Sequence, residues 1–271
     1  MMLRDLIFVS LLVVIILALT YLTYSGGLGD LPPQDIRFIA KNYLNLTYNQ
    51  EISWLWAASP EAVTAIVWDY RGLDTLFETV VFYGAILAAL TLFRSISKVP
   101  ELVSSAGLSL VVKRVTAIIT LAILTVAAST ALHGHLTPGG GFQGGAIASV
   151  APLLLLVVFG KQFFIDRKIT YNKLLSIRNI SLALLGFTSV ALLVLGFLIG
   201  VESYIFQNQA KTISTLSYPT HLLDVPLGGS LFFFNLFEFL AVAGGFTLVF
   251  TILLSKDETL RRELEGEELG Y

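Results

Sequence analysis

Six runs of mostly apolar residues dominate the pattern along the chain. A transmembrane helix needs about 20 consecutive apolar residues, and each run approaches or exceeds that length. The runs are Leu6–Tyr24, Phe77–Phe93, Val115–Leu132, Phe142–Gly160, Ile180–Val201 and Leu231–Leu254. The first run is longer than the apolar part of a secretory signal peptide, so it is interpreted as an uncleaved anchor. The pattern therefore predicts an all-α, polytopic membrane protein with about six transmembrane helices.

Composition excludes several classes of protein. Of 271 residues, 55% are hydrophobic and 13% charged, and the mean hydropathy is +0.80. Six spans in such a chain leave too little polar surface for a soluble fold. The net charge of −2 provides no basic surface for nucleic acid. The absence of Cys excludes thiol catalysis and Cys-ligated metal centres, and we expect no cofactor.

The Lys and Arg residues alternate between the loops in a way that predicts orientation. The N-terminus, the second and fourth interhelical segments and the C-terminus together carry thirteen, whereas the other segments carry four. Cytoplasmic loops are enriched in Lys and Arg. We therefore predict a multi-pass protein of the cell membrane with both termini in the cytoplasm.

Two loop regions suggest how the chain is organised. Residues 25–73 form the longest predicted outside segment, which begins irregularly and contains a predicted short helix over 60–69, with Pro60 in its first turn. Residues 94–114 contain Pro100, Ser104, Ser105 and Gly107 between apolar helices. We place a module boundary near residue 105.

A glycine-rich loop joins the third and fourth runs and is the most informative stretch. It contains His133, His135, Pro138, Gly139, Gly140, Gly141, Gly144 and Gly145. The spacing fits G-x-G-x-x-G, but no strand or βαβ unit accompanies it, so a dinucleotide site is rejected. Two interpretations stay open: close helix packing, or irregular backbone lining an ion or water cavity. For the two histidines, a proton relay or a loop-holding role is favoured over a metal site, because no third ligand is evident.

Charged residues mark the start of the second run. Asp74 and Glu78 are four residues apart and share a helix face, and Arg71 lies one turn earlier. A structural reading makes Asp74 the N-cap of the helix, with Arg71 as its surface ion-pair partner. It explains Glu78 poorly, because fifteen uncharged residues follow it. A carboxyl group there is costly unless it faces a cavity, a partner or another subunit.

The last run contains a second carboxyl group at membrane depth. Asn235 and Glu238 are three residues apart on one helix face. One alternative is a neutral Glu238 that is hydrogen-bonded to Asn235 or another helix. The other is a functional site, because a desolvated carboxyl group retains its proton more strongly and can exchange it near neutral pH.

Two stretches resemble subunits of Mrp-type multisubunit Na⁺/H⁺ antiporters. The run His133–Gly145 is similar to the Gly-His-x-x-Pro-Gly-Gly-Gly-Phe-x-Gly-Gly motif of the B subunit. The run Asp69–Glu78 resembles the Asp-Phe-Arg-Gly-Phe-Asp-Thr-Leu-Gly-Glu motif near the C-terminus of the A subunit, with Phe77 in place of the family glycine. Asn235 aligns only loosely with an acidic position of that family. The same pair of modules also occurs in membrane-bound hydrogenases and related respiratory complexes.

The resemblance implies a fusion of two modules, a two-helix module over 1–105 and a four-helix module over 106–271. It implies a non-catalytic membrane subunit of a complex that moves Na⁺ and H⁺, with other membrane subunits as partners. By hypothesis Glu78 and Glu238 bind protons or cations, and Arg71 and Asp74 form an outer ion-pair gate. The role of Glu238 rests on the cost of a buried carboxyl group and not on the resemblance. The alternatives are a passive scaffold between transport subunits and a self-sufficient small transporter.

Overall fold

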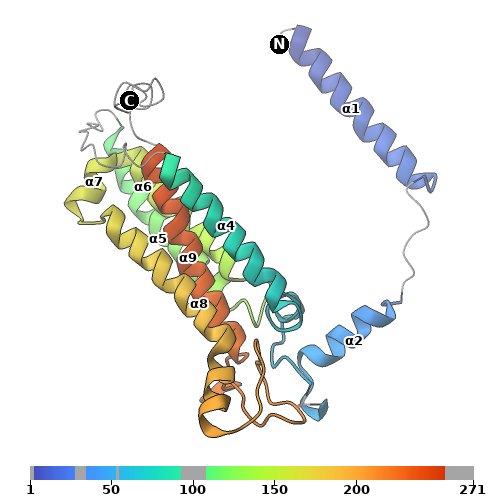
Figure 1. Cartoon of the computed structure of the whole chain (residues 1–271). Helices are drawn as coiled ribbons and strands as arrows, with labels where there is room; N and C mark the ends of the chain where they lie inside the picture. Colours follow the sequence, from blue (N-terminus) through green and yellow to red (C-terminus); the bar gives the residue numbers. More distant parts are fainter. Residues whose placement is uncertain (1–2, 28–34, 53–54, 93–107, 254–271) are drawn as a thin grey trace, which may run out of the picture. The chain divides into compact units, whose positions relative to one another are not determined.

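The computed structural model describes residues 3–27, 35–52, 55–92 and 108–253 (Figure 1). The chain forms two units, residues 1–42 and 43–271. The first contains α1 (Leu3–Tyr24), a continuous apolar helix, and the beginning of α2 (Phe38–Thr47). The predicted module junction near residue 105 and the charged tail Asp257–Glu268 lie outside the described residues.

The second unit is a bundle of five long helices, which run side by side in Figure 1. They are α4 (Gly72–Leu92), α5 (Leu110–Leu132), α6 (Gly141–Phe159), α8 (Tyr171–Ile199) and α9 (Ser230–Leu253). Together with α1 they make six described helices that are long and apolar enough to cross a membrane. The predicted all-α, polytopic fold is therefore confirmed.

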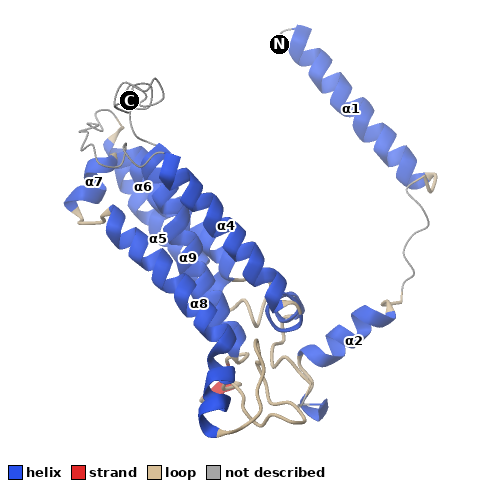
Figure 2. Cartoon of the chain, in the orientation of Figure 1, coloured by secondary structure: helices blue, strands red, loops and turns tan. Residues whose placement is uncertain are grey.

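Shorter elements lie between the long helices. They are the 3₁₀ turn η1 (Gln50–Ile52), α3 (Ala62–Thr64), the π-helical turn η2 (Ala65–Tyr70), α7 (Lys161–Asp166), and the strands β1 (His221–Leu222) and β2 (Val225–Pro226). The strands pair antiparallel, with His221 opposite Pro226. Figure 2 shows most of the loops at the end of the bundle where α4 and α9 begin. The Lys and Arg pattern predicts that this end faces outside, and it is called the predicted outer end below.

Helix α9 lies at the centre of the bundle and packs against α4, α6 and α8. Near the predicted outer end, Trp68 of η2 stacks on Phe234 of α9, with ring centroids 4.5 Å apart. Near the other end, Ile86 and Leu90 of α4 form a buried cluster with Leu248 and Ile252 of α9. Four polar side chains of α9 are buried in this packing, those of Ser230, Asn235, Glu238 and Thr247.

Several helices begin earlier than the apolar runs predict. Polar residues in the first turns fall outside a hydropathy window, although side-chain caps still start the helix there. Thr170 caps α8 by accepting a hydrogen bond from the Lys173 N–H at 3.4 Å, well before the predicted start at Ile180. The helix expected over 60–69 runs from Ala62 to Tyr70 as α3 and η2, and its N-cap is Glu61 rather than a residue before Pro60.

One alternative for Asp74 is wrong. Helix α4 begins at Gly72, so Asp74 lies inside the first turn and is not the N-cap. Its carboxylate accepts two hydrogen bonds from the Arg71 guanidinium, at 2.6 and 2.9 Å. The earlier start follows from the preceding π-helical turn, which continues almost directly into α4.

Candidate functional site

A cavity of about 300 Å³ lies between α4, α6 and α9, and residues of α3 and η2 also line it. Both membrane-depth glutamates line it, Glu78 from α4 and Glu238 from α9. The rest of the lining is Val63, Thr64, Val67, Trp68, Thr75, Thr79, Phe82, Gly139, Gly140, Phe142, Gln143, Asn235 and Val242. The structure therefore brings together residues that are far apart in the sequence.

Glu238 and Asn235 meet the beginning of α6. A carboxylate oxygen of Glu238 accepts a hydrogen bond from the Phe142 N–H at 3.0 Å. The Asn235 side-chain oxygen accepts one from the Gly141 N–H at 3.3 Å. Since the first N–H groups of a helix have no partner within the helix, these two side chains of α9 provide what an N-cap residue usually provides.

Both side chains are buried, with only 6% of Glu238 and 1% of Asn235 exposed. The Asn235 amide nitrogen has no hydrogen-bond partner among the described residues. It lies against the glycine-rich loop, since a Cβ at Gly134 would come within 2.9 Å of it. A buried polar group of this kind binds water readily when the space beside it is polar and large enough.

Glu78 occupies a different position on the same cavity. It lines the cavity, yet its side chain is exposed on the surface of the chain. It also lines a second, shallower groove together with Phe82 and Phe142. Glu78 therefore lies at the mouth of the cavity, whereas Glu238 lies inside it.

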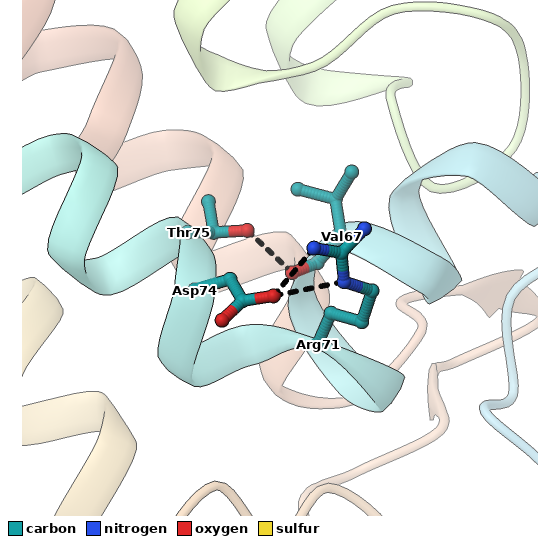
Figure 3. A network of polar contacts seen from close by, with 4 residues as sticks. All are labelled: Val67, Arg71, Asp74 and Thr75. Carbon is teal, nitrogen blue, oxygen red and sulfur yellow. Dashed lines mark hydrogen bonds and ion pairs between the residues drawn. The ribbon is translucent and has the colours of Figure 1, made fainter.

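Three threonine hydroxyls on the cavity wall already donate their protons to backbone carbonyls. Thr64 donates to Gly134, Thr75 to Val67 at 2.6 Å, and Thr79 to Thr75 at 2.9 Å. Their oxygens keep free lone pairs, so each can still accept a hydrogen bond or contact a cation. Figure 3 shows the bond from Thr75 to Val67, which ties the first turn of α4 to η2.

The Arg71–Asp74 pair lies outside the cavity. The two charged groups are 2.6 Å apart, and both side chains are more than half exposed. Asp74, by its hydrogen bonds and its charge, raises the pKa of Arg71. Figure 3 shows the two side chains facing each other at the start of α4. The predicted pairing is confirmed, and it occurs at the end of the helix nearest Glu78.

The glycine-rich loop combines the two interpretations that the sequence left open. A Cβ at Gly144 would lie 2.7 Å from the Ala131 side chain, and one at Gly145 would lie 2.7 Å from Val242. These two glycines therefore permit close contact of α6 with α5 and α9. Gly139 and Gly140 instead line the cavity, and Gly140 has a φ of +153°, a conformation that favours glycine. Pro138 is exposed in the same loop.

The two histidines have different surroundings. His133 is exposed at the C-terminal end of α5, whereas only 2% of His135 is exposed. The His135 Nε2 lies 2.8 Å from the carbonyl of Pro226, an acceptor, so Nε2 carries the proton. Burial lowers the pKa of His135, and neutral imidazole is favoured. The His135 carbonyl accepts hydrogen bonds from Ser59 at 2.7 Å and from the Glu61 N–H at 3.1 Å.

The sequence did not indicate several polar residues of the bundle. Trp68, Gln143 and the three threonines line the cavity because of how helices cross, which a hydrophobic pattern does not report. Arg178 was expected in a loop, but it lies inside α8, is 2% exposed and packs over the Tyr83 ring at 4.5 Å. The position of Arg178 inside a helix could have been predicted, because a helix often begins several polar residues before its apolar run.

Fold and cavity together define a polytopic membrane protein with two acidic side chains on one interior cavity. The family model for domains related to the MnhB subunit of Na⁺/H⁺ antiporters matches residues 111–248. The chain belongs to this family of domains related to the MnhB subunit.

Two solved structures share the fold. One is a chain of the membrane-bound sulfane sulfur reductase, an archaeal respiratory membrane complex, with a TM-score of 0.64 and 24% identity over 94% of this chain and 100% of that chain. The other belongs to the Mrp complex of Dietzia sp. DQ12-45-1b, with a TM-score of 0.61 and 19% identity over 95% of this chain and 27% of that chain. Both structures are of membrane complexes.

One curated relative matches a smaller part of this chain than the two solved structures do. An uncharacterized protein of Methanocaldococcus jannaschii is 29% identical over an alignment 117 residues long, and the match covers 37% of this chain and 45% of the relative. The match thus spans less than half the length of that relative.

Proposed function

We propose that the cavity between α4, α6 and α9 is part of a path for Na⁺ and H⁺ through a multisubunit membrane complex. The observation that carries the proposal is the position of Glu78 and Glu238, acids from two helices on one cavity at membrane depth. Ionisable residues inside a membrane are costly and face cavities or other polar groups where they occur. The partners are other membrane subunits of an Mrp-type or hydrogenase-like complex.

The two acids have different roles in this proposal. Glu78 at the mouth receives the ion or proton, and Glu238 inside the cavity holds it next. Backbone N–H groups at the start of α6 stabilise negative charge on Glu238, because helix N-termini carry partial positive charge. Asn235 and the threonine hydroxyls supply polar contacts for water or a cation along the wall.

Outside the cavity, Arg71 and Asp74 form an ion-pair gate near the predicted outer end. His135 holds the glycine-rich loop through its contacts with Pro226 and Ser59. His133, which is exposed, is the better candidate of the two for proton exchange with the solvent. The two-module division at residue 105 belongs to the same proposal.

The test is coupled transport by the complete complex in membrane vesicles. Glu78→Gln and Glu238→Gln each remove an exchangeable proton while preserving size, so each should lower Na⁺-dependent proton movement at least tenfold. Glu202→Gln is the matched control, since Glu202 is exposed and lines none of the described cavities. It should leave transport unchanged.

A passive scaffold is the second candidate, and one observation favours it. Asn235 and Glu238 cap α6, which is a structural task in itself. For a scaffold, both glutamine variants should transport normally when the complex assembles. Normal transport in assembled Glu78→Gln and Glu238→Gln complexes therefore decides for the scaffold and against the ion path.

A further inference from the structure

An open groove lies on the surface of the bundle beside the cavity mouth. It has a volume of about 640 Å³ and runs between α4 and the beginning of α6. Phe77 and Val81 of α4 line it, with 60% and 72% of their surfaces exposed. Glu78 lies between them in sequence and lines the groove as well. Arg71 and Asp74, which pair with each other, also line it. The groove thus combines apolar side chains with this ion pair and the Glu78 carboxyl group.

Lipid alone does not suit this groove. Glu78 is six residues after the start of α4, so it lies about 9 Å along the helix axis at 1.5 Å per residue. Phe77 and Val81 flank it on the exposed face, and the Arg71–Asp74 pair lies one turn earlier. A charged side chain on a lipid-facing surface at that depth is unfavourable, and such residues usually pair with another group.

Within the part of the chain that the structure describes, no cation forms an ion pair with Glu78. Arg71 is the nearby cation, but it already pairs with Asp74 at 2.6 Å. Among the described residues Glu78 forms no ion pair, and it interacts with Arg71 only through the longer-range charge of that side chain. The helix α1 carries no charged residue between Leu6 and Tyr24, so its apolar part offers no cation. Arg71, Asp74 and Glu78 together leave the groove with one carboxylate in excess.

We propose that this groove binds a transmembrane helix of a neighbouring subunit, which places a Lys or Arg side chain against Glu78. Two features of the groove indicate this occupant: the charge of Glu78 and the exposed apolar side chains beside it. A cation opposite Glu78 balances the groove, and apolar side chains around that cation match Phe77 and Val81. Because Glu78, Phe82 and Phe142 line both groove and cavity, the bound helix also lies beside the mouth of the cavity.

This inference goes beyond the proposed function, since it concerns assembly and holds whether or not the cavity conducts ions. A photo-crosslinking amino acid at Val81 of the complete complex tests it. Ile118 on α5 is the matched control, because it is also 72% exposed and lines none of the described cavities. Phe77 serves as a second position if the Val81 variant fails to assemble.

The expected product from Val81 is one adduct with a transmembrane peptide of another subunit that contains Lys or Arg, absent from the Ile118 sample. Three outcomes overturn the proposal: adducts with lipid only, an adduct with α1 of the same chain, or a partner peptide without a basic residue. All three are read by mass spectrometry and do not depend on transport.

A charge exchange tests the pairing itself. Glu78→Lys should lower co-purification of the crosslinked partner at least tenfold, and an acidic substitution of the partner's cation should restore it. Unchanged co-purification of Glu78→Lys would overturn the ion pair. Glu78→Gln, which removes only the charge, should also lower co-purification of the partner. A transport defect of Glu78→Gln in a fully assembled complex would support the ion path and overturn the ion pair.

Discussion

At the scale of single residues, one missing Cβ decides how closely the helices approach. A Cβ on Gly145 would lie 2.7 Å from the Val242 Cβ and 2.8 Å from the Phe239 carbonyl oxygen. The φ of Gly145 is not among the positive values. The requirement for glycine is therefore a matter of space between α6 and α9, and not of backbone conformation.

Gly145→Ala should destabilise the protein by about 1–3 kcal/mol, the usual cost of overpacking a closely packed contact. Gly186→Ala is the control, because a Cβ there would meet nothing within 4 Å. The measurement is thermal unfolding of the purified complex in mild detergent. Equal unfolding temperatures for the two variants would contradict this account of the α6–α9 contact.

The sequence predicted single residues well only where a charge stands out from apolar surroundings. Glu78 and Glu238 were found in this way, and the structure places both on one cavity. Trp68 and Gln143 had no such signal, because their position on the cavity depends on how η2 and α6 cross other helices. The alternative that made Asp74 the N-cap is wrong because the helix begins at Gly72.

At the scale of elements, the π-helical turn η2 connects the predicted outer end to the cavity. Trp68 of this turn lines the cavity and stacks on Phe234. The next residue, Asp69, lines a separate cavity of about 370 Å³ with Lys211. Asn208 interacts with Asp69, accepts a hydrogen bond from the Ser230 N–H at 2.9 Å and donates one to the Ala57 carbonyl. The turn is thereby linked to the start of α9.

Burial raises the pKa of Asp69 to about 6, and Lys211 and Asn208 limit the rise. The folded protein then binds more protons here than the unfolded chain, whose Asp pKa is about 3.9. Stability from this group should therefore fall as the pH rises from about 4 to about 6. Asp69→Asn should remove that component, measured as unfolding temperature against pH.

The control for Asp69→Asn is Asp224→Asn, which changes an exposed carboxyl group. It should keep the pH dependence of the parent protein. If the unfolding temperature of Asp69→Asn changes with pH between 4 and 6 as steeply as that of the parent protein, Asp69 is not the group that titrates.

The long helices were predictable as elements, whereas the loop elements were not. A transmembrane helix can be recognised in a sequence from its length and apolarity alone. All six predicted runs correspond to helices. Helix α2 and the strands β1 and β2 have short, mixed sequences that tertiary contacts define. Tyr43 of α2, for example, packs on Tyr70 of η2, with ring centroids 5.2 Å apart.

At the scale of the whole molecule, the bundle of the second unit builds its site from three distant segments. Residues around Thr64–Phe82, Gly139–Gln143 and Asn235–Val242 enclose one cavity because α9 lies between α4 and α6. Family membership and the overall fold followed from motifs and hydropathy. The cavity did not, since no spacing in the sequence reports which faces of separate helices meet. The orientation in the membrane remains a prediction from the Lys and Arg pattern.

The most direct measurement of the central claim is the reaction of Glu238 with a hydrophobic carbodiimide in the complete complex, read by mass spectrometry at increasing Na⁺. Such reagents modify protonated carboxyl groups in apolar surroundings. If the cavity exchanges protons for Na⁺, Glu238 should be labelled at low Na⁺ and protected as Na⁺ rises, and Glu78→Gln should weaken the protection. Labelling of Glu238 that stays constant over the Na⁺ range in which the complex is active would contradict the account.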